Sequence, residues 1–109
     1  MVYVVDIDGT ICSSAPNGEY EKSVPYVDRI EKINSLYDDG HTIIYFTARG
    51  MGRHNNDAEK AIAQFYDLTE KQLASWGAKY HKLILGKPAG NFYIDDKGIS
   101  AHVYFESGS

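Results

Sequence analysis

The chain has 109 residues, a length that suits one domain with one hydrophobic core and leaves no room for a second core. Its composition, with 43% hydrophobic and 24% charged residues, is that of an ordinary globular protein, and its net charge of −4 gives no general attraction to nucleic acids or anionic membranes. The sequence has no signal-peptide or transmembrane pattern, and its single cysteine, Cys12, excludes an internal disulfide, so we expect a cytoplasmic protein that does not bind membranes.

The first predicted strand is the apolar run Val2-Tyr3-Val4-Val5, whose continuous hydrophobic pattern is typical of a parallel strand covered on both faces. It leads directly into Asp6-Ile7-Asp8-Gly9-Thr10. Open α/β sheets bind ligands at the carboxyl ends of their strands, and Gly9 allows a tight turn whose backbone N–H groups approach an anion. The segment is either a phosphoryl-transfer site, with one carboxylate as nucleophile and the other moving protons, or a turn in which both aspartates only accept backbone hydrogen bonds.

A short polar segment and a helix follow this turn. Residues 12–23 are small and polar, with Asn17-Gly18 at their centre, which predicts a two-residue hairpin. Cys12 at its start is expected to be a small loop residue, since no histidine adjoins it in sequence to activate a thiol. A helix is predicted to begin at Pro25 and to end before Gly40, because one face carries an apolar stripe made of Val27, Ile30, Ile33, Leu36 and Tyr37.

The middle of the chain is predicted to form a strand, a loop and two helices. The strand covers residues 41–46 and ends in Thr47-Ala48-Arg49, and the loop covers 49–56. Thr69 and Gln72 match the first and last positions of a capping box, which places a helix start at Thr69. We therefore expect separate helices over about 57–66 and 69–76.

The last third of the chain is predicted to be mostly extended. Strands are expected over 82–85, followed by Gly86-Lys87-Pro88, over 91–94, followed by Asp95-Asp96, and at the sheet edge over 101–105. Residues 106–109 are expected to be a tail outside the domain. Alternating strands and helices predict a parallel sheet with right-handed crossovers, so the polar residues at the strand ends should share one edge of the sheet.

Four strand ends that carry Asp/Asp, Thr, Lys and Asp/Asp in this order resemble the haloacid dehalogenase (HAD) superfamily, whose members are mostly Mg²⁺-dependent phosphatases and phosphotransferases. The resemblance covers about residues 1–97 and implies a Rossmann-like three-layer α/β sandwich with a mainly parallel sheet, here as one domain over 1–105. HAD enzymes carry cap domains after the first motif or between the second and third. Because residues 11–24 and 50–78 have room only for a hairpin, a loop and helices, we expect a core without a cap.

The resemblance also implies roles for individual residues. Asp6 is the expected nucleophile, which forms an aspartyl-phosphate, and Asp8 is the general acid and then the base. Lys87 is expected to neutralise the nucleophile and the phosphoryl oxygens, and Thr47 to orient the transferring group. The implied substrate-binding residues are Gly9, Thr10, Ala48 and Arg49, and the implied Mg²⁺ ligands are Asp6, Asp8 through its backbone carbonyl, Asp95 and Asp96.

Each of these residues also has a purely structural interpretation. In that interpretation Thr47 caps the following turn, Lys87 is a solvated loop lysine, and Asp95-Asp96 is a turn. For Thr47 and Lys87 taken singly, the structural interpretation is favoured, whereas the joint pattern at successive strand ends favours the site. Asp96 either binds metal through water or positions Lys87. Arg49 either binds substrate or forms a surface ion pair with an acidic residue such as Asp57 or Glu59.

The favoured function is a Mg²⁺-dependent phosphomonoester hydrolase. The segments FTARG, LASWGAKYHKLILGKP and YIDDKGIS resemble small HAD proteins encoded with bacterial polysaccharide or capsule genes, which implies a small sugar phosphate or related metabolite as substrate. The open site would then be covered by the 12–23 hairpin, the 50–56 loop or a second subunit of a homo-oligomer. The alternatives are a nucleic-acid 3′-end phosphatase, for which the expected basic track is missing, a silent phosphate- or metal-binding module, and a phospho-receiver domain, which Asp-x-Asp-Gly-Thr fits poorly.

Overall fold

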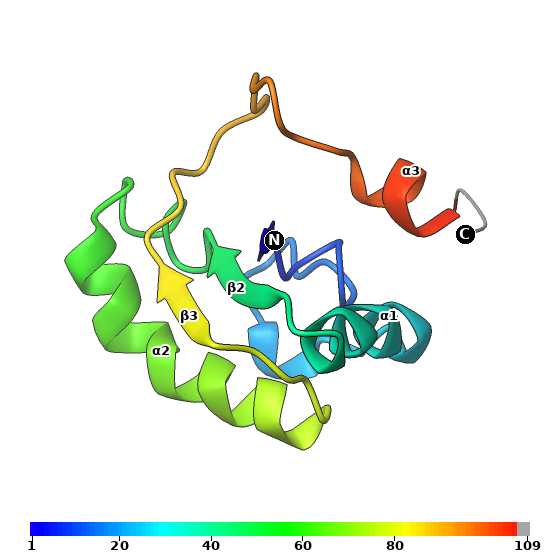
Figure 1. Ribbon diagram of the computed structural model, residues 1–109. Coiled ribbons are helices and arrows are strands. Elements are labelled where there is room, and N and C mark those ends of the chain that lie inside the picture. The colour runs from blue at the N-terminus through cyan, green and yellow to red at the C-terminus, as the bar shows by residue number, and fades with distance from the viewer. Residues whose placement is uncertain (107–109) are drawn as a thin grey trace.

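The computed structural model describes residues 1–106 and contains a three-stranded parallel sheet (Figure 1). Its strands are β1 (Val2–Val5), β2 (Thr42–Thr47) and β3 (Lys82–Leu85), arranged in the order β1-β2-β3. The register pairs Val5 with Tyr45 and Thr47 with Leu85, so all three strands end at the same edge of the sheet. The predicted α/β class with a parallel sheet is confirmed, and the predicted tail lies, apart from Glu106, outside the described residues.

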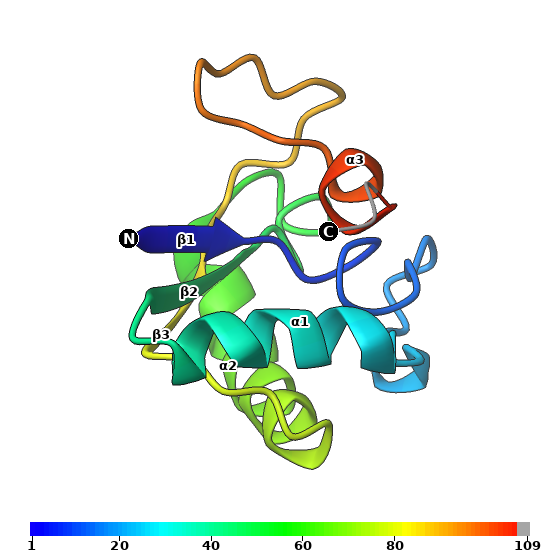
Figure 2. The ribbon, with the colours of Figure 1, turned by 45° about the vertical axis from the view of Figure 1, so that its right-hand side comes forward.

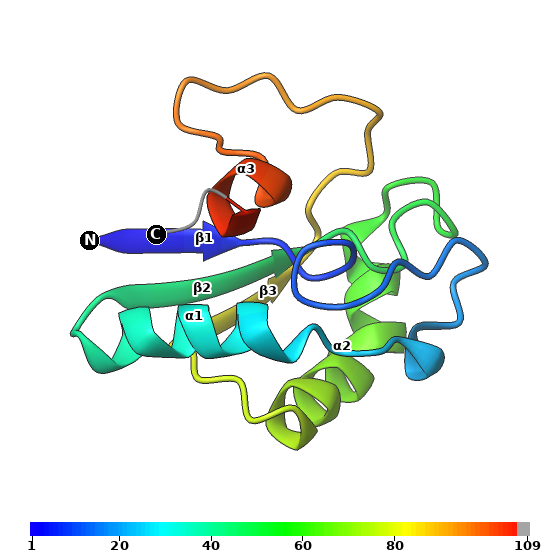
Figure 3. The same ribbon diagram turned by 90° about the vertical axis from the view of Figure 1, so that its right-hand side faces the viewer.

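Two long helices, α1 (Val27–Asp38) and α2 (Ala58–Ser75), cover the same face of the sheet (Figures 2 and 3). This arrangement follows from the two consecutive crossovers, β1 to β2 and β2 to β3, which move across the sheet in one direction and have the same hand. The strand residues that face the helices form the core, whereas alternate residues face away from it. The buried hydrophobic residues of the three strands and two long helices are Val5, Ile30, Ile33, Ile43, Tyr45, Ala61, Phe65, Leu73, Leu83 and Leu85.

The predicted break between two helices is wrong, because α2 runs without interruption from Ala58 to Ser75. Asp57 caps it, and its carboxylate accepts a hydrogen bond from the backbone N–H of Lys60. Thr69, predicted as an N-cap, lies fully buried inside the helix and donates its hydroxyl to the carbonyl of Phe65 at 2.8 Å. Residues 58–75 contain no glycine or proline, so the helix continues past Thr69 although the sequence there matches a capping box.

The segment after β1 is not the predicted hairpin. Residues 15–18 form a turn that the Gly18 N–H closes onto the carbonyl of Ala15, and the chain then enters the short 3₁₀ helix η1 (Tyr20–Lys22). Gly18 has φ +72°, a left-handed conformation that favours glycine. Single backbone bridges tie Cys12 to Asp8 and to Pro25, so the segment forms a folded loop rather than a pair of strands.

The predicted strands over 91–94 and 101–105 are also absent from the described part of the chain. Residues 86–100 form a long loop that extends away from the sheet, and residues 101–106 form the helix α3 (Ala101–Glu106) beside β1 and α1 (Figures 1 and 3). Lys32 of α1 donates to the carbonyl of Tyr104, and Arg29 contacts Glu106 at 3.3 Å. Ser100 Oγ accepts the N–H of Val103 at 3.2 Å at the start of this helix, and the contacts with α1 hold the helix in place, so the predicted edge strand is wrong. None of the helices within residues 1–106 is long and apolar enough to cross a membrane.

Candidate active site

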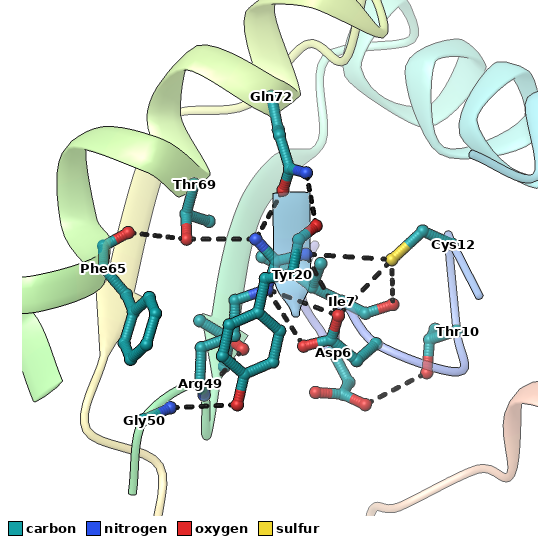
Figure 4. Close-up of polar contacts among 12 residues, drawn as sticks. Asp6, Ile7, Thr10, Cys12, Tyr20, Arg49, Gly50, Phe65, Thr69 and Gln72 are labelled. Carbon is teal, nitrogen blue, oxygen red and sulfur yellow. Dashed lines mark hydrogen bonds and ion pairs between the residues drawn. The ribbon is translucent and has the colours of Figure 1, made fainter. Parts of the chain in front are cut away.

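Asp6 stands at the carboxyl end of β1, where a compact turn presents its side chain. The N–H groups of Thr10 and Ile11 both bond to the carbonyl of Ile7, and the N–H of Gly9 bonds to the carbonyl of Cys12. Gly9 has φ +78°, which this tight return of the chain requires. Ile7 and Ile11 are fully buried and anchor the turn in the core. As a result, the Thr10 hydroxyl lies 3.2 Å from Asp6 Oδ2, to which it donates (Figure 4).

Lys87 meets Asp6 from the loop after β3. The two lie 3.7 Å apart, from Lys87 Nζ to Asp6 Oδ1, and the side chain of Asp6 keeps 34% of its surface exposed. Burial raises the pKa of the Asp6 carboxyl above its usual range, and Lys87, the backbone N–H of Ile7 and the Thr10 hydroxyl act in the opposite direction. The backbone N–H of Lys87 bonds to the carbonyl of Thr47, which fixes the loop at this edge of the sheet. The structure thus brings together Asp6, Thr10 and Lys87, as expected from the strand ends.

Asp8 points to a different partner, Arg49. The guanidinium grips its carboxylate with Nε 3.0 Å from Oδ2 and Nη2 3.0 Å from Oδ1. The thiol of Cys12 donates to Asp8 Oδ1 at 3.5 Å, and burial, followed by the charge of Asp8, raises the pKa of this thiol to about 12. Cys12 therefore stays protonated. It lies in the loop after β1, as predicted, and its side chain is fully buried in the core.

Arg49 is almost completely buried, and it also contacts Thr69, Gln72 and Tyr20 (Figure 4). Its Nη1 donates to Thr69 Oγ1 at 3.2 Å and to Gln72 Oε1 at 2.5 Å, and its guanidinium lies 4.9 Å from the centre of the Tyr20 ring. The surface ion pair with Asp57 or Glu59 does not form, because a side chain with no exposed surface cannot pair with exposed carboxylates. Arg49 therefore stands behind Asp8 in the protein interior.

Thr47 and Ala48 form the turn at the end of β2. Thr47 is fully buried, and its Oγ1 accepts a hydrogen bond from the backbone N–H of Arg49 at 3.1 Å, which is the capping arrangement that the sequence left open. The hydroxyl keeps its own proton for donation. The carbonyl of Ala48 accepts the N–H of Met51 at 2.9 Å and closes the turn.

Asp95 and Asp96 do not join this group. They lie exposed in the 86–100 loop, where Asp95 accepts the backbone N–H of Lys97 at 3.0 Å, as in the turn interpretation. That hydrogen bond, with a further one from Asp96, lowers the pKa of the Asp95 carboxyl. Within residues 1–106, no three His, Cys, Asp or Glu side chains lie close enough together to hold a metal ion. The side chains of Asp95 and Asp96 are therefore not assembled with Asp6 into the expected Mg²⁺ site.

Three residues of the site were not recognised in the sequence: Tyr20, Thr69 and Gln72. Gln72 donates through Nε2 to the carbonyl of Tyr20 at 2.6 Å, and the Tyr20 hydroxyl accepts the N–H of Gly50 at 3.1 Å. A signal was present, because Thr69 and Gln72 lie on the same helical face as Phe65 and Leu73. Polar side chains on an apolar face indicate a buried polar partner, which here is Arg49.

No protein-family model matches the chain, and no curated protein matches its sequence significantly. Among solved structures, an MCSG target protein from Vibrio cholerae is similar with a TM-score of 0.83 at 24% identity, and the match covers 99% of this chain and 98% of that one. A chain of the Pnkp1/Rnl/Hen1 complex is similar with a TM-score of 0.56 at 17% identity, covering 98% of this chain but 34% of that one.

A D,D-heptose 1,7-bisphosphate phosphatase from B. bronchiseptica, determined in complex with magnesium and phosphate, is similar with a TM-score of 0.55 at 17% identity, covering 92% of this chain and 54% of that one. The chain thus spans only part of the last two proteins. At these identities, the likenesses establish the fold. The protein shares with these structures a Rossmann-type α/β fold, and it carries Asp6 at the end of the first strand.

Proposed function

We propose that the protein is a phosphomonoester hydrolase that acts through an aspartyl-phosphate on Asp6. The observation that carries this proposal is the convergence of the Asp6 carboxylate, the Lys87 ammonium and the Thr10 hydroxyl at the carboxyl edge of the sheet. A carboxylate does not approach a phosphate dianion without a cation nearby, and Lys87 supplies that charge at the point of attack. Lys87 also carries the donors that orient the phosphoryl oxygens, because the Thr47 hydroxyl is fully buried and the turn N–H groups already bond to carbonyls.

The proposed reaction has two steps. An oxygen of the ionised Asp6 attacks phosphorus, the bond from phosphorus to the leaving oxygen breaks, and Asp8 gives its proton to that oxygen. Water then attacks the phosphorus, Asp8 takes one of its protons, and the bond to Asp6 breaks, which returns the free carboxylate. Asp8 suits this transfer of protons because its side chain is 21% exposed to solvent and the buried Arg49 fixes its orientation.

We also propose that activity depends on Mg²⁺, on the basis of the resemblance to the HAD superfamily. Magnesium would neutralise charge on the phosphoryl group and on Asp6. Of the expected ligands, the Asp6 carboxylate lies at the site and the backbone carbonyl of Asp8 belongs to the same turn, whereas Asp95 and Asp96 lie in the exposed loop. The steps above are therefore carried by Asp6, Asp8 and Lys87.

For the substrate we propose a small phosphorylated sugar or related metabolite of polysaccharide synthesis. The net charge of −4 and the scattered lysines disfavour a nucleic-acid track, and the segments between the strands contain only a loop, η1 and α2 where a cap domain would be inserted. A site without a cap would be bordered by residues 12–23 and 50–56, or by a second copy of the chain.

Phosphate release from a panel of metabolites, with Mg²⁺ present, tests the proposal. Asp6→Asn and Asp8→Asn should each lower turnover by more than about a hundredfold, the contribution of one positioned nucleophile or proton-transfer group. Asp67→Asn, the same change on the exposed face of α2, is the matched control and should leave turnover unchanged. A folded Asp6→Asn protein with nearly wild-type turnover would overturn the assignment.

A further inference from the structure

All five N–H donors of Arg49 have a hydrogen-bond partner. Two chelate Asp8, one reaches the sulfur of Cys12 at 3.9 Å, and two bond to Thr69 and Gln72. A guanidinium with no exposed surface and no spare donor is badly placed to bind a phosphate that arrives from solvent. It is well placed to hold the carboxylate in front of it.

The same guanidinium is also connected to residues 12–23, the segment that follows the Asp6 turn. Gln72 accepts from Arg49 through Oε1 and donates through Nε2 to the carbonyl of Tyr20, so one amide connects the two (Figure 4). The Tyr20 ring lies against Arg49, with the guanidinium carbon 4.9 Å from the ring centre, and it packs edge-on against Phe65 with the two ring centres 4.9 Å apart. Its hydroxyl accepts the N–H of Gly50, the residue after Arg49. Tyr20 is thus the anchor of residues 12–23 on the α2 side of the site.

We propose that Arg49 is a positioning residue, which fixes the Asp8 carboxylate and, through Gln72 and Tyr20, fastens the segment 12–23 over the site, rather than a ligand of the substrate. This inference rests on the proposed function. A buried charge with all its hydrogen bonds made holds its partners in one arrangement, because breaking any one of them leaves an unpaired buried group. The orientation of Asp8 and the position of the segment 12–23 therefore depend on each other.

Such a role predicts a distinct kinetic pattern. If Asp8 loses its orientation, proton transfer to the leaving oxygen becomes slower, and the rate falls most for substrates with strongly basic leaving groups. An alkyl phosphate needs that proton, whereas p-nitrophenyl phosphate loses a weakly basic phenolate without it. Loss of a substrate ligand would instead raise KM for both compounds alike.

Two variants separate the parts of this network. Arg49→Lys keeps the charge but cannot chelate Asp8 while also reaching Gln72. Gln72→Glu keeps an acceptor for Arg49 but removes the N–H that reaches Tyr20, and it sets a carboxylate oxygen against that carbonyl. It also avoids changing the buried cation, so it serves if Arg49→Lys does not fold. Gln64→Glu, the same change at an exposed position of α2, is the control.

The experiment combines steady-state and single-turnover kinetics with hydrogen exchange of the intact protein. For Arg49→Lys, we expect the single-turnover rate of phosphoryl transfer from an alkyl phosphate to Asp6 to fall by at least about tenfold. The same rate for p-nitrophenyl phosphate, and the KM values of both substrates, should change by less than about threefold. For Gln72→Glu, amide exchange within residues 12–23 should become at least about tenfold faster than in the wild type and in Gln64→Glu.

A raised KM with equal effects on both substrates would show that Arg49 binds substrate and would overturn the inference. Unchanged exchange of residues 12–23 in Gln72→Glu would also overturn it, because the link to Tyr20 would then carry no restraint. A wild-type protein that releases no phosphate from any compound would refute the proposed function, whereas the exchange comparison needs no turnover and still decides the link.

Discussion

Replacing Gly50 by alanine tests the packing around the Arg49 turn. Gly50 has φ +80°, and an added Cβ would lie 2.6 Å and 2.8 Å from two ring carbons of Phe65 and 3.2 Å from the Cα of Ala61. A left-handed conformation costs a non-glycine residue about 1–2 kcal/mol, and overpacking of a core costs about 1–3 kcal/mol, so Gly50→Ala should lose about 2–5 kcal/mol of unfolding free energy. That is a large share of the roughly 5–15 kcal/mol that stabilises a typical domain.

Urea unfolding at neutral pH measures this loss, and Gly52→Ala is the matched control. Gly52 lies two residues further along the same loop, with nothing within 4 Å of an added Cβ and no left-handed φ, so its substitution should change the unfolding free energy by less than about 0.5 kcal/mol. Because Phe65 packs on Tyr20, the Gly50→Ala protein should also show faster exchange in residues 12–23. Equal stability of the two variants would refute the close packing of this turn against α2.

Three further outcomes are expected. Burial raises the pKa of Asp6, so folding favours the protonated carboxyl, and this contribution to stability is lost as the pH rises through the folded pKa. Asp6→Asn should therefore melt at a higher temperature than the wild type at neutral pH, and the difference should shrink toward pH 3.8. Excess chelator should abolish p-nitrophenyl phosphate turnover, and added Mg²⁺ should restore it; undiminished turnover in chelator would contradict the Mg²⁺ requirement. If Asp95 is a ligand, added Mg²⁺ should also slow amide exchange in residues 91–96. Raising the salt concentration should change kcat/KM for a sugar phosphate only mildly, and a preference for a 3′-phosphorylated oligonucleotide with steep loss in salt would favour the nucleic-acid alternative.

The parts of the fold that depend on local pattern could be predicted from the sequence. The apolar runs of β1, β2 and β3 and the stripe of α1 were placed to within a few residues, because side-chain periodicity reflects which face is buried. The meeting of Asp6 and Lys87 also followed, since parallel strands end at one edge of the sheet.

The parts that depend on distant contacts could not be predicted in this way. The Thr69-x-x-Gln72 pattern is the same in a capping box and on a buried helix face, and only the approach of Arg49 distinguishes the two. Residues 91–94 have the composition of a strand, but a strand forms only with a partner, and in the structure this segment stays in the exposed loop. Residues 101–106 form a helix that contacts Arg29 and Lys32 of α1 and that Ser100 caps locally, so only its position against α1 depends on distant residues.

The most direct test of the proposed chemistry is to trap the phosphoryl group on the protein. Asp8→Asn should accept the group from p-nitrophenyl phosphate, whose leaving group needs no proton, but should lack the base that activates water, so the aspartyl-phosphate should accumulate. Acid quenching followed by mass spectrometry of the peptides should then locate the adduct on Asp6, and the Asp6→Asn, Asp8→Asn double variant should carry none. A phosphoryl group on another residue, or none in Asp8→Asn while the wild type turns over, would contradict the account.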